Sequence, residues 1–200
     1  MPRTRTSQIR AHVFATAFHV KRLLVRRMQS ALGRLAWLLE FARRPPGVGL
    51  RGRALMDLQE QILMFCNCQA GVHFASDLVR QLGTDTMLGL QREVQVGINS
   101  YLYDRTGGWL LPRVKQRLVR DPRTGSGRFE LTGAPKELFL QFAASLVAAE
   151  GARIANCARP GCDNLFVCRK RGAYCSKRCS QYVRTKRYRE SHLKIEGGRA

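Results

Sequence analysis

Apolar residues recur at helical spacing through most of the central part of the chain. The clearest helix is 135–150, because its proline suits a first turn and Gly151 stands where a helix would end. One face of this helix is lined by Leu138, Phe142, Leu146 and Ala149. Residues 54–82 lack proline and have enough apolar positions for one long helix or two shorter ones.

A further helix is predicted from a cap at Thr84 or Asp85 to about Tyr101. Val94, Val96 and Ile98 also alternate as a strand would, but helix is the better interpretation.

The pattern changes to two short strand-like runs, 107–119 and 127–133, with a turn-rich loop between them. Pro112 confines the first run to a sheet edge. The predicted fold is therefore a mainly α N-terminal and central domain, which a small β-hairpin could accompany.

Residues 9–41 form a candidate basic amphipathic helix, with arginines between regularly spaced apolar residues. Such a segment could lie on a membrane, serve as an organelle transit peptide or touch nucleic acid. It could equally be a solvated extension, or precede a true start at Met28 or Met56. Since 43–52 is rich in Arg, Pro and Gly, we expect 1–50 to be an extension and linker and 51–152 a mostly helical domain. Residues 153–200 form the remaining domain.

The net charge of +21 is concentrated at the two ends of the chain. Residues 1–50 hold ten Lys and Arg against one acid, 51–150 hold twelve against ten, and 151–200 hold thirteen against three. Such an excess favours an anionic partner, with nucleic acid first and anionic membrane second. No uncharged apolar run is long enough for a transmembrane helix, so no transmembrane insertion is expected.

Seven cysteines are present, and five of them fall between Cys157 and Cys179. No signal peptide is evident, and clustered cysteine pairs in a reducing compartment more often bind metal than form disulfides. We therefore expect a cytoplasmic protein with a metal site.

The spacing within the cluster is Cys157-x4-Cys162 and Cys175-x3-Cys179. Four thiolates in two close pairs suit one tetrahedral zinc ion, and with no position left for water the zinc would be structural. Pro160 and Gly161 suit a tight turn.

Ser176 could cap a helix that carries Cys179 in its first turn. With a short hairpin formed by Leu165, Phe166 and Val167 against Ala173 and Tyr174, these parts predict a C-terminal treble-clef zinc finger.

Three cysteines lie outside this set. Cys168 could be a spare thiol, an alternative ligand or an oxidation-sensitive site, and a spare is favoured because four ligands already satisfy the spacing. Cys66 and Cys68 would point about 200° apart on a helix, so core packing is expected for at least one of them.

The last 40 or so residues resemble the CGNR-type zinc finger of a family of bacterial proteins regarded as transcription regulators. The matching residues are Arg153, Cys157, Cys162, Phe166, Tyr174, Cys175, Cys179 and the basic helix that follows. Ser180, Gln181 and Tyr182 stand where the family has Gly, Asn and Arg. The resemblance implies a zinc-binding, DNA-binding regulator with a mostly helical N-terminal domain.

The helix after Cys175 is strongly basic, and Tyr182 and Tyr188 are interleaved with its cations. We expect Cys179 and Val183 to face the metal core. The predicted nucleic-acid-binding residues are Lys177, Arg178, Arg184, Lys186, Arg187 and Arg189. The alternative is a solvated helix whose charges only keep the module soluble.

Three functions remain open from the sequence. The first is a bacterial DNA-binding transcription regulator, whose central domain could form a homodimer or sense a ligand. The second is an RNA-binding or ribosome-associated zinc protein, and the third is a protein-interaction adaptor with a structural zinc module. An enzyme is not expected, because no histidine has a partner at catalytic spacing and no Walker or dinucleotide motif occurs.

Overall fold

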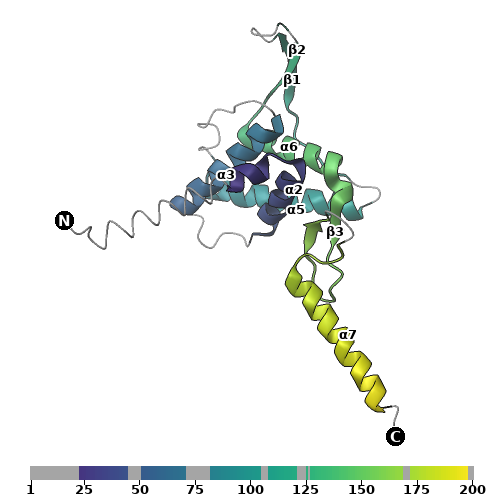
Figure 1. Ribbon diagram of the computed structural model, residues 1–200. Helices are drawn as coiled ribbons and strands as arrows, with labels where there is room; N and C mark the ends of the chain where they lie inside the picture. Colours follow the sequence, from purple (N-terminus) through teal and green to yellow (C-terminus); the bar gives the residue numbers. More distant parts are fainter. Residues whose placement is uncertain are drawn as a thin grey trace, which may run out of the picture. The chain divides into compact units, whose positions relative to one another are not determined.

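The chain contains helices and two small antiparallel sheets, in a computed structural model that describes most of its residues (Figure 1). The described residues are 23–44, 51–70, 82–104, 108–120, 125, 127–168 and 172–197. They divide into two compact units, one up to Ala148 and one from Ala149. The predicted boundary was 152/153, close to this division.

The first unit is built mainly from helices. Its elements are α2 (Ala31–Arg43), α3 (Arg53–Ala70), α5 (Thr84–Tyr103), β1 (Lys115–Arg120), β2 (Gly127–Thr132) and α6 (Pro135–Glu150). The predicted helical character of 54–82, 84–101 and 135–150 is confirmed where the structure describes these segments. None of the described helices is both long and apolar enough to cross a bilayer.

Four aromatic side chains form the centre of the first unit's core: Trp37, Phe41, Phe65 and Phe139. The ring centroids of Trp37 and Phe65 lie 5.1 Å apart, and Phe139 meets Phe41 and Phe65 edge-on at 5.4 Å. These are the offset and edge-to-face arrangements that aromatic rings prefer. The buried indole of Trp37 donates its Nε1 hydrogen to Gln61 Oε1 at 3.0 Å, so its one polar atom has a partner.

This core corrects our interpretation of residues 1–50 as an extension and linker. Trp37 and Phe41 belong to α2, and Met28 just before it is also fully buried. A chain starting at Met56 would lack Trp37 and Phe41, which are half of the aromatic cluster. This segment packs into the core because burial of its apolar side chains outweighs the charge of the neighbouring arginines. The predictions for 1–22 lie outside the described residues.

Residues 9–41 are also not one continuous helix. Ser30 caps α2 by accepting a hydrogen bond from the Gly33 amide at 3.0 Å. The backbone before the cap comes so close that a Cβ on Gly33 would lie 1.8 Å from the Arg27 carbonyl oxygen. The apolar residues of this segment therefore keep helical spacing in the sequence although the helix itself is interrupted before Ala31.

The predicted hairpin is confirmed, with β1 and β2 antiparallel and Leu118 opposite Phe129. The N-cap of helix α5 is Gly83, one residue before Thr84 and two before Asp85, the two caps expected from the sequence, and it makes no side-chain cap hydrogen bond. Gly97 in α5 is buried against the Trp109 side chain, and a Cβ there would lie 2.1 Å from the indole ring. In α6, Ala149 is exposed and is not part of the apolar face.

The second unit contains a single turn of 3₁₀ helix, two short strands and one long helix. In chain order these are η1 (Gly151–Arg153), β3 (Ile154–Asn156), β4 (Leu165–Val167) and α7 (Lys177–Gly197). β3 and β4 are antiparallel, with Ala155 opposite Phe166. The predicted partner of 165–167 was therefore wrong: it pairs with 154–156 and not with Ala173 and Tyr174, because the turn at Cys157–Cys162 folds the chain back on itself.

Candidate metal centre and its basic helix

The first cysteine pair lies on the turn that joins β3 to β4. The amide of Cys157 donates to the Asn164 carbonyl at 3.1 Å, and the amide of Cys162 donates to the Arg159 carbonyl at 3.1 Å. Gly161 has a positive φ of 71°, which a residue without Cβ adopts at little cost. These bonds close the turn and bring both thiols of the pair to the same side.

The second pair lies at the start of α7. Ser176 Oγ accepts a hydrogen bond from the Cys179 amide at 3.2 Å, and the Ser176 carbonyl accepts one from the Ser180 amide at 3.1 Å. Ser176 is thus the predicted cap, with Cys175 just before the helix and Cys179 in its first turn. A helix start favours negative charge, and so favours thiolate over thiol.

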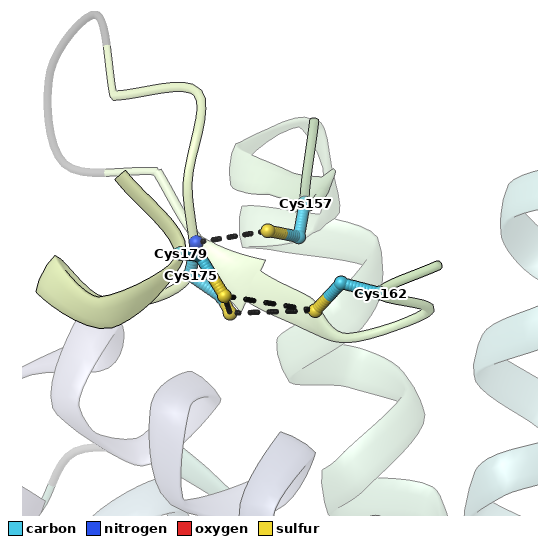
Figure 2. Close-up of side chains that lie close together, drawn as sticks. All are labelled: Cys157, Cys162, Cys175 and Cys179. Atoms are coloured by element: carbon cyan, nitrogen blue, oxygen red, sulfur yellow. Dashed lines mark hydrogen bonds between the residues drawn. The ribbon is translucent and has the colours of Figure 1, made fainter. Parts of the chain in front are cut away.

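The structure brings Cys157, Cys162, Cys175 and Cys179 together, with all four sulfurs within 4.8 Å of one another (Figure 2). Cys162 Sγ lies 3.8 Å from Cys175 Sγ and 3.9 Å from Cys179 Sγ, and the last two sulfurs are 3.5 Å apart. All four cysteines are free of disulfides.

The three separations among Cys162, Cys175 and Cys179 are close to those that a bound metal ion would need. Zinc–sulfur bonds of about 2.3 Å in a tetrahedron place the sulfurs about 3.8 Å apart. The donor set therefore fits one metal ion with four thiolate ligands, and zinc is the ion that such sites usually bind. The β3–β4 turn would supply two of these ligands and the start of α7 the other two.

Hydrogen-bond donors contact three of the four sulfurs. The Cys175 amide donates to Cys157 Sγ at 3.5 Å, Asn164 Nδ2 to Cys175 Sγ at 3.8 Å, and Arg159 Nη1 to Cys179 Sγ at 3.8 Å. Such donors stabilise the negative charge that thiolate ligands carry, and they fix the direction in which each sulfur points.

The pKa values of the thiols move in opposite directions. Hydrogen bonding with Ser176, and then with Cys175, Arg159 and Cys157, lowers the pKa of Cys179 to about 6 against the opposing effect of burial. Burial, followed by hydrogen bonding with the other thiols, raises the pKa of Cys175 to about 12. Four thiolates this close repel one another, so a cation at their centre is required for all of them to ionise together.

Arg159 connects the Cys157–Cys162 turn with helix α7. Besides its bond to Cys179, its guanidinium carbon lies 4.4 Å from the centre of the Tyr182 ring. The bond to the sulfur raises the pKa of Arg159 above its ordinary value, so the residue remains a cation. Its Nε is buried and has no hydrogen-bond partner within the part of the chain that the structure describes.

The remaining cysteines lie apart from this site. Cys168 Sγ donates to the Gly172 carbonyl at 3.4 Å and is not one of the four clustered thiols. Cys66 is buried in α3, and burial raises the pKa of its thiol to about 12, as expected for core packing. Cys68 is only partly buried.

Helix α7 places its predicted basic residues in solvent. Lys177, Arg178, Arg184, Lys186, Arg187 and Arg189 are all exposed, whereas Cys179 and Val183 are buried as expected. Lys186 Nζ lies 3.8 Å from Glu190 Oε1. Tyr188 is 65% exposed and its ring lies 4.1 Å from that of His192, whereas one face of the Tyr182 ring is covered by Arg159.

The sequence interpretation missed Arg159 and Asn164 as partners of the sulfurs. Both lie within or next to the Cys157–Cys162 pair, and proximity to a ligand is the one signal that could have indicated them. No protein-family model matches the chain. A search of curated proteins found no similar sequence.

Proposed function

We propose that the second unit is a treble-clef zinc module whose α7 binds nucleic acid, and that the protein is a bacterial DNA-binding transcription regulator of the CGNR type. The observation that carries the proposal is the direct attachment of an exposed basic helix to a cage of four thiols. Cys179 belongs to both, because it is a cage residue in the first turn of α7.

The ligand set supports a structural role for the metal. Four protein sulfurs occupy the four positions of a tetrahedral ion, which leaves no position for a substrate or a reactive water. The metal would then hold the β3–β4 turn against the start of α7. Few apolar side chains are available to hold these two parts together. The buried residues of this unit include Ile154 and Val183 besides two of the cysteines.

The charge on α7 supports nucleic acid as the partner. Between Lys177 and His192 the chain has six Lys and Arg but a single acid, Glu190. Most of these cations therefore have no carboxylate on their own helix to neutralise them, and phosphates would do so with release of counterions. DNA is preferred over RNA on the resemblance to the CGNR-type finger.

The first test is zinc content and DNA binding on the same purified samples of the chain and of Cys157→Ser and Cys175→Ser. One zinc per chain, lost in both variants together with DNA binding, is the expected result. Reduced protein without zinc would overturn the metal assignment.

The second test uses charge reversal on the helix. Arg184→Glu combined with Arg187→Glu is expected to weaken DNA binding and flatten its salt dependence while zinc content stays the same. Unchanged DNA affinity in this variant would refute DNA binding by α7.

An RNA-binding function is the second candidate, and the exposed ring of Tyr188 favours it because tyrosine stacks on unpaired bases. Tighter binding of a single-stranded RNA than of duplex DNA of equal length would select it. Absence of binding to either at low salt would select a protein-interaction adaptor instead.

A further inference from the structure

Between Arg184 and His192, helix α7 has no buried side. From Arg184 to His192 every residue is exposed, and Val183 is the last buried position among the described side chains of this helix. A helix that is polar all round gains nothing from packing on its own domain. Its side chains are therefore available to a partner on several sides at once.

The sides of α7 differ in the chemistry they present. At about 100° per residue, the face opposite Cys179 is centred on Tyr188, about 180° away. Gln181, Arg184 and His192 lie within about 40° of Tyr188 on either side. These exposed side chains offer hydrogen-bond donors, acceptors and aromatic surface, and no acid is among them.

Cations flank this face on both sides. Arg187 lies about 80° from Cys179 on one side, and Arg178 and Arg189 lie about 80–100° from it on the other. All three are exposed. A stripe of polar and aromatic side chains thus lies between Arg187 on one flank and Arg178 and Arg189 on the other.

We propose that α7 lies in the major groove of duplex DNA with this Tyr188 face towards the base edges. The inference rests on the proposed nucleic-acid function and names its form and orientation. A helix is about 10–12 Å across with its side chains and the major groove of B-DNA is about 12 Å wide, so cations on both flanks of the helix face the phosphates of both strands.

Other nucleic acids fit this arrangement less well. The major groove of duplex RNA is too deep and narrow for side chains to read, and a single strand would contact one flank only. Among base-reading side chains Gln181 suits adenine and Arg184 suits guanine.

Lys186 supplies a matched control, because it is the one member of the predicted nucleic-acid-binding set that this orientation turns away from the groove. It lies about 20° from Cys179 around the helix, and its ammonium group is paired with Glu190. In this orientation Lys186 points away from the DNA, although it is as exposed and as basic as its neighbours.

The experiment measures binding of the zinc-loaded full chain to a labelled mixed-sequence DNA duplex at several salt concentrations. A duplex RNA and a single-stranded DNA of the same length are the comparison probes. We expect the DNA duplex to bind at least about tenfold more tightly than the others. Arg187→Ala and Arg189→Ala should each lower the salt slope by about one, and Lys186→Ala should leave it unchanged.

The outcomes separate the two proposals. No binding to any probe would overturn the nucleic-acid function and the groove orientation together. Binding that Lys186→Ala weakens as much as Arg189→Ala, or equal affinity for duplex RNA, would overturn the orientation and leave nucleic-acid binding standing. Equal zinc content and helical circular dichroism in all variants would show that each has folded.

A separate readout tests the reading face. Gln181→Ala should leave the salt slope unchanged and reduce the preference among sequences selected from a random duplex pool. An unchanged preference would count against base contacts by this face.

Discussion

Arg159 is the residue that links the proposed metal to the proposed DNA-binding helix. Its guanidinium donates to Cys179 Sγ and also stacks on Tyr182, one turn along α7. Four thiolates around a divalent ion carry two excess negative charges, and a fixed cation beside them offsets part of that charge. No spacing rule predicts such a residue, because its role depends on contacts that only folding creates.

Replacing Arg159 should therefore weaken metal binding. We expect Arg159→Ala to lower zinc affinity about tenfold or more, as loss of a ligand's hydrogen-bond partner usually does. Arg159→Lys keeps the charge but loses the planar stack on Tyr182. Its zinc affinity should therefore lie between that of the unaltered protein and that of Arg159→Ala. Competition with a chromophoric chelator measures all three proteins, and equal affinities would show that Arg159 only packs against Tyr182.

Cys66 provides a test of burial at the residue scale. Its pKa is raised to about 12 by desolvation, so its thiol stays protonated and inaccessible at mildly alkaline pH. The folded chain keeps this proton to higher pH than the unfolded chain does, so the thiol's contribution to stability is present below the ordinary value of 9.0 and is lost as pH rises towards 12.

Alkylation of the native protein should accordingly modify Cys68 much faster than Cys66, as resolved by peptide mass spectrometry. In strong denaturant the two rates should become similar. Equal rates in the native protein would mean that α3 opens readily or is not packed as described.

At the scale of elements, the close contact between α5 and the segment after it depends on one glycine. A Cβ at Gly97 would collide with the Trp109 indole at 2.1 Å. Gly97→Ala should lower the free energy of unfolding by about 1–3 kcal/mol, as overpacking generally does. Gly89, on the same helix with nothing within 4 Å of its Cβ position, is the control. Gly89→Ala should stabilise by about 0.5–1 kcal/mol.

The double variant Gly97→Ala/Trp109→Ala tests the cause. Removing the indole should abolish the penalty, so Gly97→Ala should be neutral or stabilising in the Trp109→Ala background. Chemical denaturation gives the four free energies of this cycle. An additive result would mean that Trp109 does not lie against α5.

How far the sequence predicts these elements depends on what determines each one. Helix α6 and the β1–β2 hairpin follow from local pattern and turn residues, which are properties of the sequence itself. The pairing of β3 with β4 and the burial of α2 depend on tertiary contacts. The arginines between the apolar residues of 9–41 left a solvated extension open as one interpretation, and nothing local showed that Trp37 and Phe41 pack against Phe139.

At the scale of the whole molecule, the two units differ in what stabilises them. The first has a core of large aromatic and aliphatic side chains. The second has little apolar core, and its four thiols are its main cross-link. If the four thiols bind the proposed metal, a small module of this kind would depend on that metal for folding.

Metal removal should therefore unfold one unit and spare the other. Both tryptophans, Trp37 and Trp109, lie in the first unit, so their fluorescence reports on it alone. A strong chelator is expected to reduce helical circular dichroism and abolish DNA binding while tryptophan emission stays native. Re-addition of zinc should restore both signals, and loss of native tryptophan emission on chelation would contradict independent units.

The ligands of the candidate metal site were predictable because the spacing of cysteines can be read directly from the sequence. Cys157, Cys162, Cys175 and Cys179 follow from spacing alone, whereas the sulfur separations, the part played by Asn164 and the covered face of Tyr182 required the fold.

The exposure of α7 from Arg184 to His192 also has a consequence for how the protein survives in a cell extract. Trypsin cleaves after Lys and Arg, and this exposed stretch offers four such bonds, after Arg184, Lys186, Arg187 and Arg189. Only the backbone hydrogen bonds of the helix delay cleavage there, and cleavage follows when local fraying opens those bonds. Whatever covers the helix in the cell should therefore leave a protease footprint over these residues.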